Sequence, residues 1–148
     1  MNASRLQWLV FGFVISWFAA TTLQTACAAS PIGLWRGADA TFEIFETEGT
    51  LSAKIVSLTE PMTPEGKEKT DIYNPDPTKR EDPIVGLIFI SGCAKKSENH
   101  WENGTVYDPS NGRSYSCYVD LQDADKIKLR GYIGSSLIGR NYIWTRVN

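Results

Sequence analysis

The segment YNPDPTKREDP, residues 73–83, places carboxylates and an amide among three prolines. With Asp71 just before it, Asn74 and Asp76 offer the oxygen ligands that Ca²⁺ prefers, but their spacing lacks the alternating ligands, central glycine and late glutamate of an EF-hand loop. Proline restricts the backbone before it to extended forms, and Asn or Asp beside Pro forms turns through its own side chain. We therefore expect a stiff structural connection, with no metal and no cofactor.

Nucleophilic catalysis has little support in the composition. The chain has one histidine, His100, so any Ser-His or Cys-His arrangement must use it. His100 lies in the polar stretch KKSENHW, which favours a surface position. A zinc site needs three or four nitrogen or sulfur ligands, and one histidine with two cysteines is too few. Asp108 and Asp120 lie at turn and strand ends without a paired acid and base. We expect no catalytic residues and no enzyme.

The first 28 residues are predicted to be an export signal. One positive charge, Arg5, precedes an apolar run from Trp8 to Ala20, and Ala26-Cys27-Ala28 forms a small-residue cleavage site. The run is shorter than the roughly 20 residues that span a bilayer. An uncleaved anchor and lipidation of Cys27 are the alternatives. We expect cleavage after Ala28, one domain at 29–148, a periplasmic or secreted location and no membrane span after cleavage.

The charges argue against one class of partner. The chain has 15 basic and 17 acidic residues, a net charge of −2. No basic patch stands out, so we expect no nucleic-acid binding. We also expect a monomer.

Removal of Cys27 would leave Cys93 and Cys117. In an oxidising compartment two cysteines in one small domain are able to form a disulfide. Alternatively, both are small buried hydrophobes. We expect Cys93 and Cys117 to form a disulfide in the mature protein. Because they lie one strand apart, the bond would require a bend at Gly92 that carries Cys93 across the end of the sheet.

Period-two hydrophobic patterning bounded by turn residues predicts an all-β fold. Glu48-Gly49 is a tight hairpin signal. Lys126, Lys128 and Arg130 alternate with apolar residues, and we interpret their side as a solvated outer face. Eight short strands favour an eight-stranded up-and-down antiparallel β-barrel, with a two-sheet β-sandwich as the alternative. The strands are expected at 34–38, 41–47, 50–58, 84–91, 100–107, 113–121, 126–132 and 139–147.

Five stretches carry a family resemblance: GLWRG, NPDP, DPIVGLIFISG, WENGTVYDPSNGRSYSC and LRGYIGSSLIGRNYIWTR. In this order they resemble the uncharacterised secreted bacterial proteins grouped as domain-of-unknown-function family 2147. The resemblance implies a calycin-like barrel without an established activity. Many such relatives carry a cysteine-rich segment where this chain has DIYNPDP, so the partner of Cys117 stays open, either Cys93 or none.

The two ends of the mature chain resemble those of lipocalin-type barrels. Such barrels begin with Gly-x-Trp and close with an arginine that covers the tryptophan, which here implies a structural contact between Trp35 and Arg146. A guanidinium over an indole face contributes roughly 0.5 to 2 kcal/mol.

Two classes of function remain. The first is a barrel that binds a small apolar or envelope-derived ligand at the end opposite Trp35, with Tyr73, Tyr142 and Trp144 as candidate ligand-binding residues. The second is an envelope protein-interaction module, an inhibitor or assembly factor, with a filled barrel and no ligand. A large dry cavity lined by Tyr, Trp and Ile would favour the first function, and a filled core with an exposed aromatic patch would favour the second.

Overall fold

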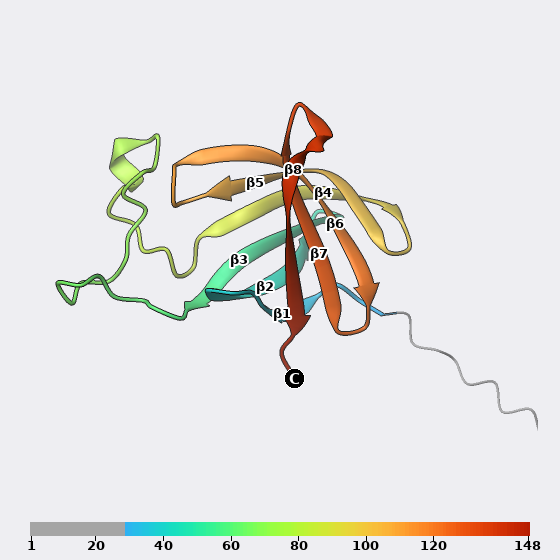
Figure 1. Cartoon of the computed structure of the whole chain (residues 1–148), viewed down its shortest axis with the longest axis horizontal. Helices are drawn as coiled ribbons and strands as arrows, with labels where there is room; N and C mark the ends of the chain where they lie inside the picture. Colours follow the sequence, from blue (N-terminus) through green and yellow to red (C-terminus); the bar gives the residue numbers. More distant parts are fainter. Residues whose placement is uncertain (1–28) are drawn as a thin grey trace, which may run out of the picture.

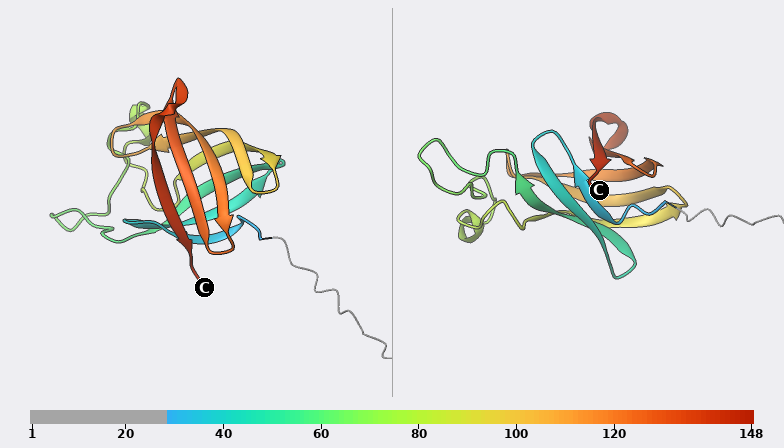
Figure 2. Two further views of the ribbon diagram at one scale, coloured as in Figure 1. Left: turned by 45° about the vertical axis from the view of Figure 1, so that its right-hand side comes forward. Right: turned by 90° about the horizontal axis from the view of Figure 1, so that it is seen from below.

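The computed structural model describes residues 29–148, so the predicted signal at 1–28 lies outside the described residues. Eight antiparallel strands follow one another around a closed barrel (Figures 1 and 2). The predicted eight-stranded up-and-down barrel is therefore confirmed. The strands are β1 (Gly33–Arg36), β2 (Ala40–Thr47), β3 (Thr50–Leu58), β4 (Ile88–Ser97), β5 (His100–Asp108), β6 (Arg113–Asp123), β7 (Lys126–Ile133) and β8 (Ser135–Arg146).

Short turns join all consecutive strands except β3 and β4. Glu48 and Gly49 both have positive φ, 51° and 76°, which is the geometry that lets a two-residue hairpin follow the twist of its strands. The β3–β4 connection, residues 59–87, contains a single short 3₁₀ helix, η1 (Pro77–Lys79). Loops of this length are uncommon in compact domains and often carry function.

The long connection lies at one end of the barrel, which we call the rim. Because the strands alternate in direction, the rim is formed by residues 37–39, 59–87, 109–112 and Gly134. Both ends of the described chain lie at the opposite end of the barrel, and the long connection extends away from them (Figure 1). We call this opposite end of the barrel the floor.

One continuous hydrophobic core occupies the barrel. Apolar residues alternate along the strands, so one face of each strand points inward. Large side chains such as Trp35, Ile90 and Ile127 are almost completely inaccessible to solvent. The buried apolar residues are Trp35, Ala40, Ile44, Leu51, Ala53, Ile55, Phe89, Ile90, Cys93, Trp101, Cys117, Val119, Leu121, Ile127, Leu129 and Trp144.

The largest deviation from the expected strand boundaries is in β4. The strand predicted at 84–91 begins at Ile88 and continues to Ser97. Gly86 has a φ of 95°, and its N–H donates to the carbonyl of Ile55, so the chain turns here before it pairs regularly. Ile84 and Leu87 pack against the core from the connection instead of from the strand.

Candidate functional site

Arg146 joins the last strand to the first at the floor of the barrel. Its guanidinium carbon lies 4.2 Å from the centroid of the Trp35 ring, which is fully buried. The guanidinium also donates to the backbone carbonyls of Ala124, Ile32 and Ser30. These contacts are structural, because they hold together the two strands whose pairing closes the barrel.

The three candidate ligand-binding residues lie in different surroundings. Trp144 is 4% exposed and stacks in the core against Phe42, with ring centroids 4.4 Å apart, and against Phe89 at 6.0 Å. Tyr142 on β8 and Tyr73 in the long connection are both about half exposed. Within residues 29–148, no aromatic contact joins Tyr73 or Tyr142 to Trp144. The structure does not assemble these three residues into one site.

Cys93 and Cys117 face each other inside the barrel across strand β5. Both are completely buried free thiols, and their sulfur atoms are 3.8 Å apart. Gly104 lies between them on β5, where a Cβ would overlap the Cys93 sulfur and come within 3.1 Å of the Cys117 sulfur. A glycine therefore makes the space in which two side chains from non-adjacent strands meet. The hydrogen bond with Cys93, together with burial, raises the pKa of the Cys117 thiol.

The expected route for this cysteine contact was wrong. Gly92 does bend β4, with a φ of 72° at a bulge in its pairing with β3. Cys93 nevertheless stays within β4, opposite Leu51, and is not carried across the end of the sheet. The sulfur atoms are beyond disulfide bonding distance, so the structure contains a thiol pair.

A buried carboxylate of the long connection bonds it to strand β5. Asp71 is 1% exposed, and it accepts hydrogen bonds from the Tyr107 hydroxyl at 2.8 Å and from the Asn74 amide at 2.7 Å. Close to this bond, a Cβ on Gly112 would overlap the backbone carbonyl of Tyr73, so the connection lies directly against the β5–β6 turn. Burial and the carboxylate of Asp71 raise the pKa of Tyr107 to about 12.

The other oxygen ligands considered in this segment serve local turns. Asp76 accepts from the backbone N–H and the hydroxyl of Thr78, which caps η1 and holds the pKa of its carboxyl below its usual range. The side-chain oxygen of Asn74 accepts from the N–H of Asp76. Within residues 29–148, no three or more metal-ligating side chains come together. This geometry agrees with a structural loop.

His100 belongs to a polar cluster on the outer face of the barrel that the sequence did not predict. Its Nδ1 contacts Asp120, whose other oxygen lies 2.6 Å from the Lys128 ammonium. Its Nε2 lies 3.5 Å from Glu102. Although burial opposes it, hydrogen bonds from Lys128 and His100 hold the pKa of the Asp120 carboxyl below its usual range. The cross-strand register His100↔Asp120↔Lys128 brings together residues that lie on three strands.

The β7–β8 hairpin exposes large apolar side chains. Leu137 is 87% exposed, Ile138 70% and Ile133 64%, and all three lie near the Gly134 turn. Between the pairs Tyr132↔Gly139 and Ile133↔Ser135 the register shifts, so β8 carries extra residues that bulge outward. Figure 1 shows this hairpin projecting beyond the neighbouring strands.

Arg130 holds this bulge in place. Its guanidinium donates to the carbonyls of Ser136, at 2.7 Å, and Leu137, at 3.3 Å, and to the side-chain oxygen of Asn141 at 2.8 Å. These three hydrogen bonds from one planar guanidinium join β7 to both the tip and the following part of β8. The backbone that carries the exposed apolar side chains is thus held by hydrogen bonds from Arg130.

Comparison with known proteins gives the family. A family model described as "Uncharacterized protein conserved in bacteria (DUF2147)" matches residues 33–146. The chain belongs to the DUF2147 family. A search among curated proteins found no match.

A solved structure shares the fold of this DUF2147 barrel. It is described as "Protein HP1028 from the human pathogen Helicobacter pylori belongs to the lipocalin family". The match has a TM-score of 0.72 at 20% sequence identity, and it covers 81% of this chain and 84% of that chain. At this identity the similarity shows the lipocalin-like fold alone.

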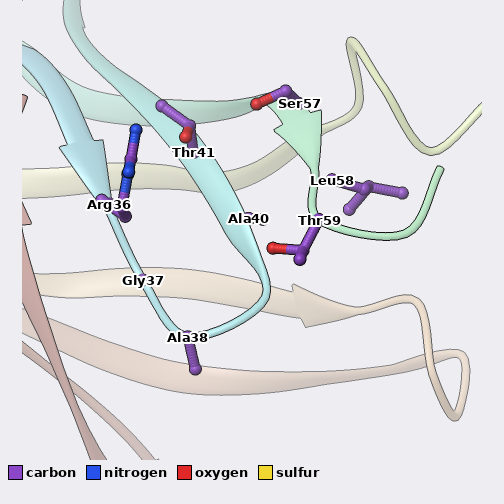
Figure 3. A pocket seen from close by; sticks show the side chains of 8 residues that line it. All are labelled: Arg36, Gly37, Ala38, Ala40, Thr41, Ser57, Leu58 and Thr59. Atoms are coloured by element: carbon purple, nitrogen blue, oxygen red, sulfur yellow. The ribbon is translucent and has the colours of Figure 1, made fainter.

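Hollows on the described part of this DUF2147 protein include two that lie outside the barrel interior. One, of about 210 Å³, lies where β1, β2 and β3 meet the rim, and Arg36, Thr41 and Ser57 are among its lining residues (Figure 3). The other lies within the connection, between Glu60 and Lys69. The interior residues form one packed cluster instead. No helix in residues 29–148 is long and apolar enough to cross a membrane.

Proposed function

We propose that this DUF2147 protein is an exported, non-catalytic interaction module that binds another protein of the cell envelope through its β7–β8 hairpin. The observation that carries the proposal is the exposure of Leu137 and Ile138, at 87% and 70%, on a bulge that Arg130 holds with three hydrogen bonds. Exposed apolar patches on a folded domain commonly mark interaction sites. Export is the expectation from residues 1–28.

The packing of the interior favours this function over ligand transport. Eight strands leave room either for packed side chains or for one small ligand. Here Trp144, Phe42 and Phe89 contact one another, and the side chains of Trp144 and Phe42 lie beside Gly37 of the rim. A ligand that entered from the rim would have to displace these rings.

The exposed tip can be tested with a photo-crosslinking amino acid in place of Leu137, in the bacterium that makes the protein. Met62, also exposed but in the long connection, is the matched control position. We expect a discrete protein adduct from position 137 that position 62 does not give. Identification of the adduct by mass spectrometry, followed by binding measurements with the purified pair, would establish the partner.

The ligand-binding alternative predicts other results. It requires saturable binding of fluorescent fatty acids or polycyclic probes, with a change in Trp144 fluorescence, and a small molecule that co-purifies in native mass spectrometry. Those findings, without an adduct at position 137, would refute the interaction function.

A further inference from the structure

The backbone N–H and C=O groups of β8 point toward β7 at some residues and toward the β1 side at others. The N–H of Arg146 donates to the carbonyl of Asp125, on the β7 side, and the N–H of Val147 donates to the carbonyl of Leu34 of β1. In an antiparallel strand the N–H and C=O of one residue point to the same side, and the side alternates along the chain. Where β8 follows this alternation, the backbone N–H and C=O groups of its odd-numbered residues therefore point away from β7.

Strand β1 covers only the last part of that side. It pairs with β8 through Trp35↔Arg146 and Arg36↔Thr145 and then ends. The backbone groups of Gly139, Asn141 and Ile143 consequently extend past the end of β1. Within residues 29–148, no other strand pairs with them on this side. We call these three residues the β8 edge.

The β8 edge is an open hydrogen-bonding template. Natural sheets usually protect long edges by proline, bulges or covering loops, because an unpaired row of N–H and C=O groups accepts a further strand. No proline occurs in β8. The bulge that Arg130 holds lies before Gly139, so the regular part of the strand remains available.

The charged residues of the β7–β8 hairpin itself have one sign. From Lys126 to Arg146 the sequence contains basic residues and no acidic ones. Lys128 is paired with Asp120, and Arg130 and Arg146 are bound to backbone carbonyls. Arg140 lies between Gly139 and Asn141 of the β8 edge. No ion pair or side-chain hydrogen bond of Arg140 is found in the described part of the chain.

We propose that the β8 edge binds an extended, acidic segment of a partner protein, which adds to the barrel as a further strand and places a carboxylate against Arg140. This inference rests on the proposed interaction function and specifies its partner. Main-chain hydrogen bonds supply affinity in such strand addition, and side chains supply selectivity. A planar guanidinium binds a carboxylate with two parallel hydrogen bonds.

Two other occupants fit less well. A second copy of this chain would bring its own basic β8 against Arg140, and like charges placed opposite each other across strands are destabilising. A lipid surface offers few donors to the carbonyls of Gly139, Asn141 and Ile143, although it would receive Leu137 and Ile138.

Amide hydrogen exchange followed by NMR tests the β8 edge directly. In the free protein we expect the amides of Gly139, Asn141 and Ile143 to exchange at least about ten-fold faster than those of Arg140 and Tyr142, which bond to β7. Equal protection of the two sets would overturn the inference at once, because the edge would then not be open.

Two capped heptapeptides, one alternating valine with glutamate and one alternating valine with lysine, serve as probes at millimolar concentration. The glutamate peptide should slow the three edge amides by about ten-fold, and the lysine peptide should not. Arg140→Glu should reverse this preference. Arg113→Glu, an exposed position on β6, should leave it unchanged.

Each remaining outcome decides against the acidic strand. Unchanged edge amides, or equal slowing by both peptides, would refute it. Slowing that grows with protein concentration without peptide would assign the edge to a second copy, and slowing by anionic vesicles alone would assign it to lipid. An adduct from position 137 together with unprotected edge amides would leave the interaction function standing and remove only this inference.

Discussion

The Tyr107 hydroxyl of β5 donates a 2.8 Å hydrogen bond to the Asp71 carboxylate of the long connection, although 36 positions separate them in sequence. The carboxylate is almost completely buried, so its loss would leave Tyr107 and Asn74 without their acceptor. This contact is therefore one of those that hold the connection against the barrel.

Replacement of Asp71 should release the connection without opening the barrel. We expect Asp71→Ala to lower the free energy of unfolding by about 2 kcal/mol, because the partly buried donors of Tyr107 and Asn74 lose their acceptor. Limited proteolysis should cut residues 59–83 faster in this variant. Asp82→Ala, on an exposed residue of the same connection, is the control, and similar cleavage of both variants would contradict the assignment.

The same bond predicts an alkaline transition. Because the pKa of Tyr107 is raised from 10 to about 12, the folded protein holds its phenolic proton more tightly than the unfolded chain does. The stabilisation is complete below pH 10 and is lost as the pH rises towards 12. Denaturant titrations across this interval should show a steeper loss of stability in the natural protein than in Tyr107→Phe. Parallel curves would argue against it.

The Trp35–Arg146 contact should stabilise the barrel closure. Arg146→Ala is expected to lower the free energy of unfolding by about 1 to 2 kcal/mol, since the cation–π contact and several hydrogen bonds to carbonyls disappear. Arg146→Lys keeps the charge but not the planar fork, and it should lie between the two. Arg113→Ala should have little effect. Chemical denaturation measures all four proteins.

Gly104 should tolerate no side chain. We expect Gly104→Ala to cost about 3 kcal/mol, because the new methyl group would overlap the Cys93 sulfur inside a packed core. Gly131→Ala on β7 is the matched control, since its Cβ would meet its nearest neighbour at 3.4 Å, an ordinary contact. A Gly104→Ala variant as stable as Gly131→Ala would show that the thiol pair does not fill this space.

The thiol pair itself should respond to the compartment. The sulfur atoms of Cys93 and Cys117 are 3.8 Å apart, so a disulfide, whose S–S bond is about 2 Å long, would require the two side chains to move closer together. Protein exported to an oxidising compartment is expected to show no free thiol under denaturing conditions without reductant, and cytoplasmic protein to show two. Two free thiols in the exported protein would exclude the disulfide.

The sequence predicted the fold well and the candidate surface poorly. Strands are recognisable because inward and outward residues alternate, and the Glu48-Gly49 signal gives a turn of known geometry. Alternation did not show that Trp144, a candidate ligand-binding residue, lies in a packed core. That depends on Phe42 and Phe89, which lie far away in sequence.

The exposed features depend on register and on where strands end. The bulge before Gly139 arises from the bonds of Arg130, whose alternation with apolar residues had suggested only a solvated face. The open edge exists because β1 ends at Arg36 and pairs only with Thr145 and Arg146, which leaves the earlier residues of β8 without a partner strand on that side. A glycine lying between two cysteines likewise becomes visible only when three strands are aligned.

The closure of the barrel by Trp35 and Arg146 also constrains the order in which the chain can fold. Because β1 pairs with the end of β8, the amino-terminal part of the chain cannot complete the core before the carboxyl-terminal residues have been synthesised. Contacts between such distant residues are slow to form, because the intervening chain must be ordered first. During this delay the newly made chain leaves Trp35 and the inner face of β2 accessible to proteases, to chaperones and to other unfolded chains.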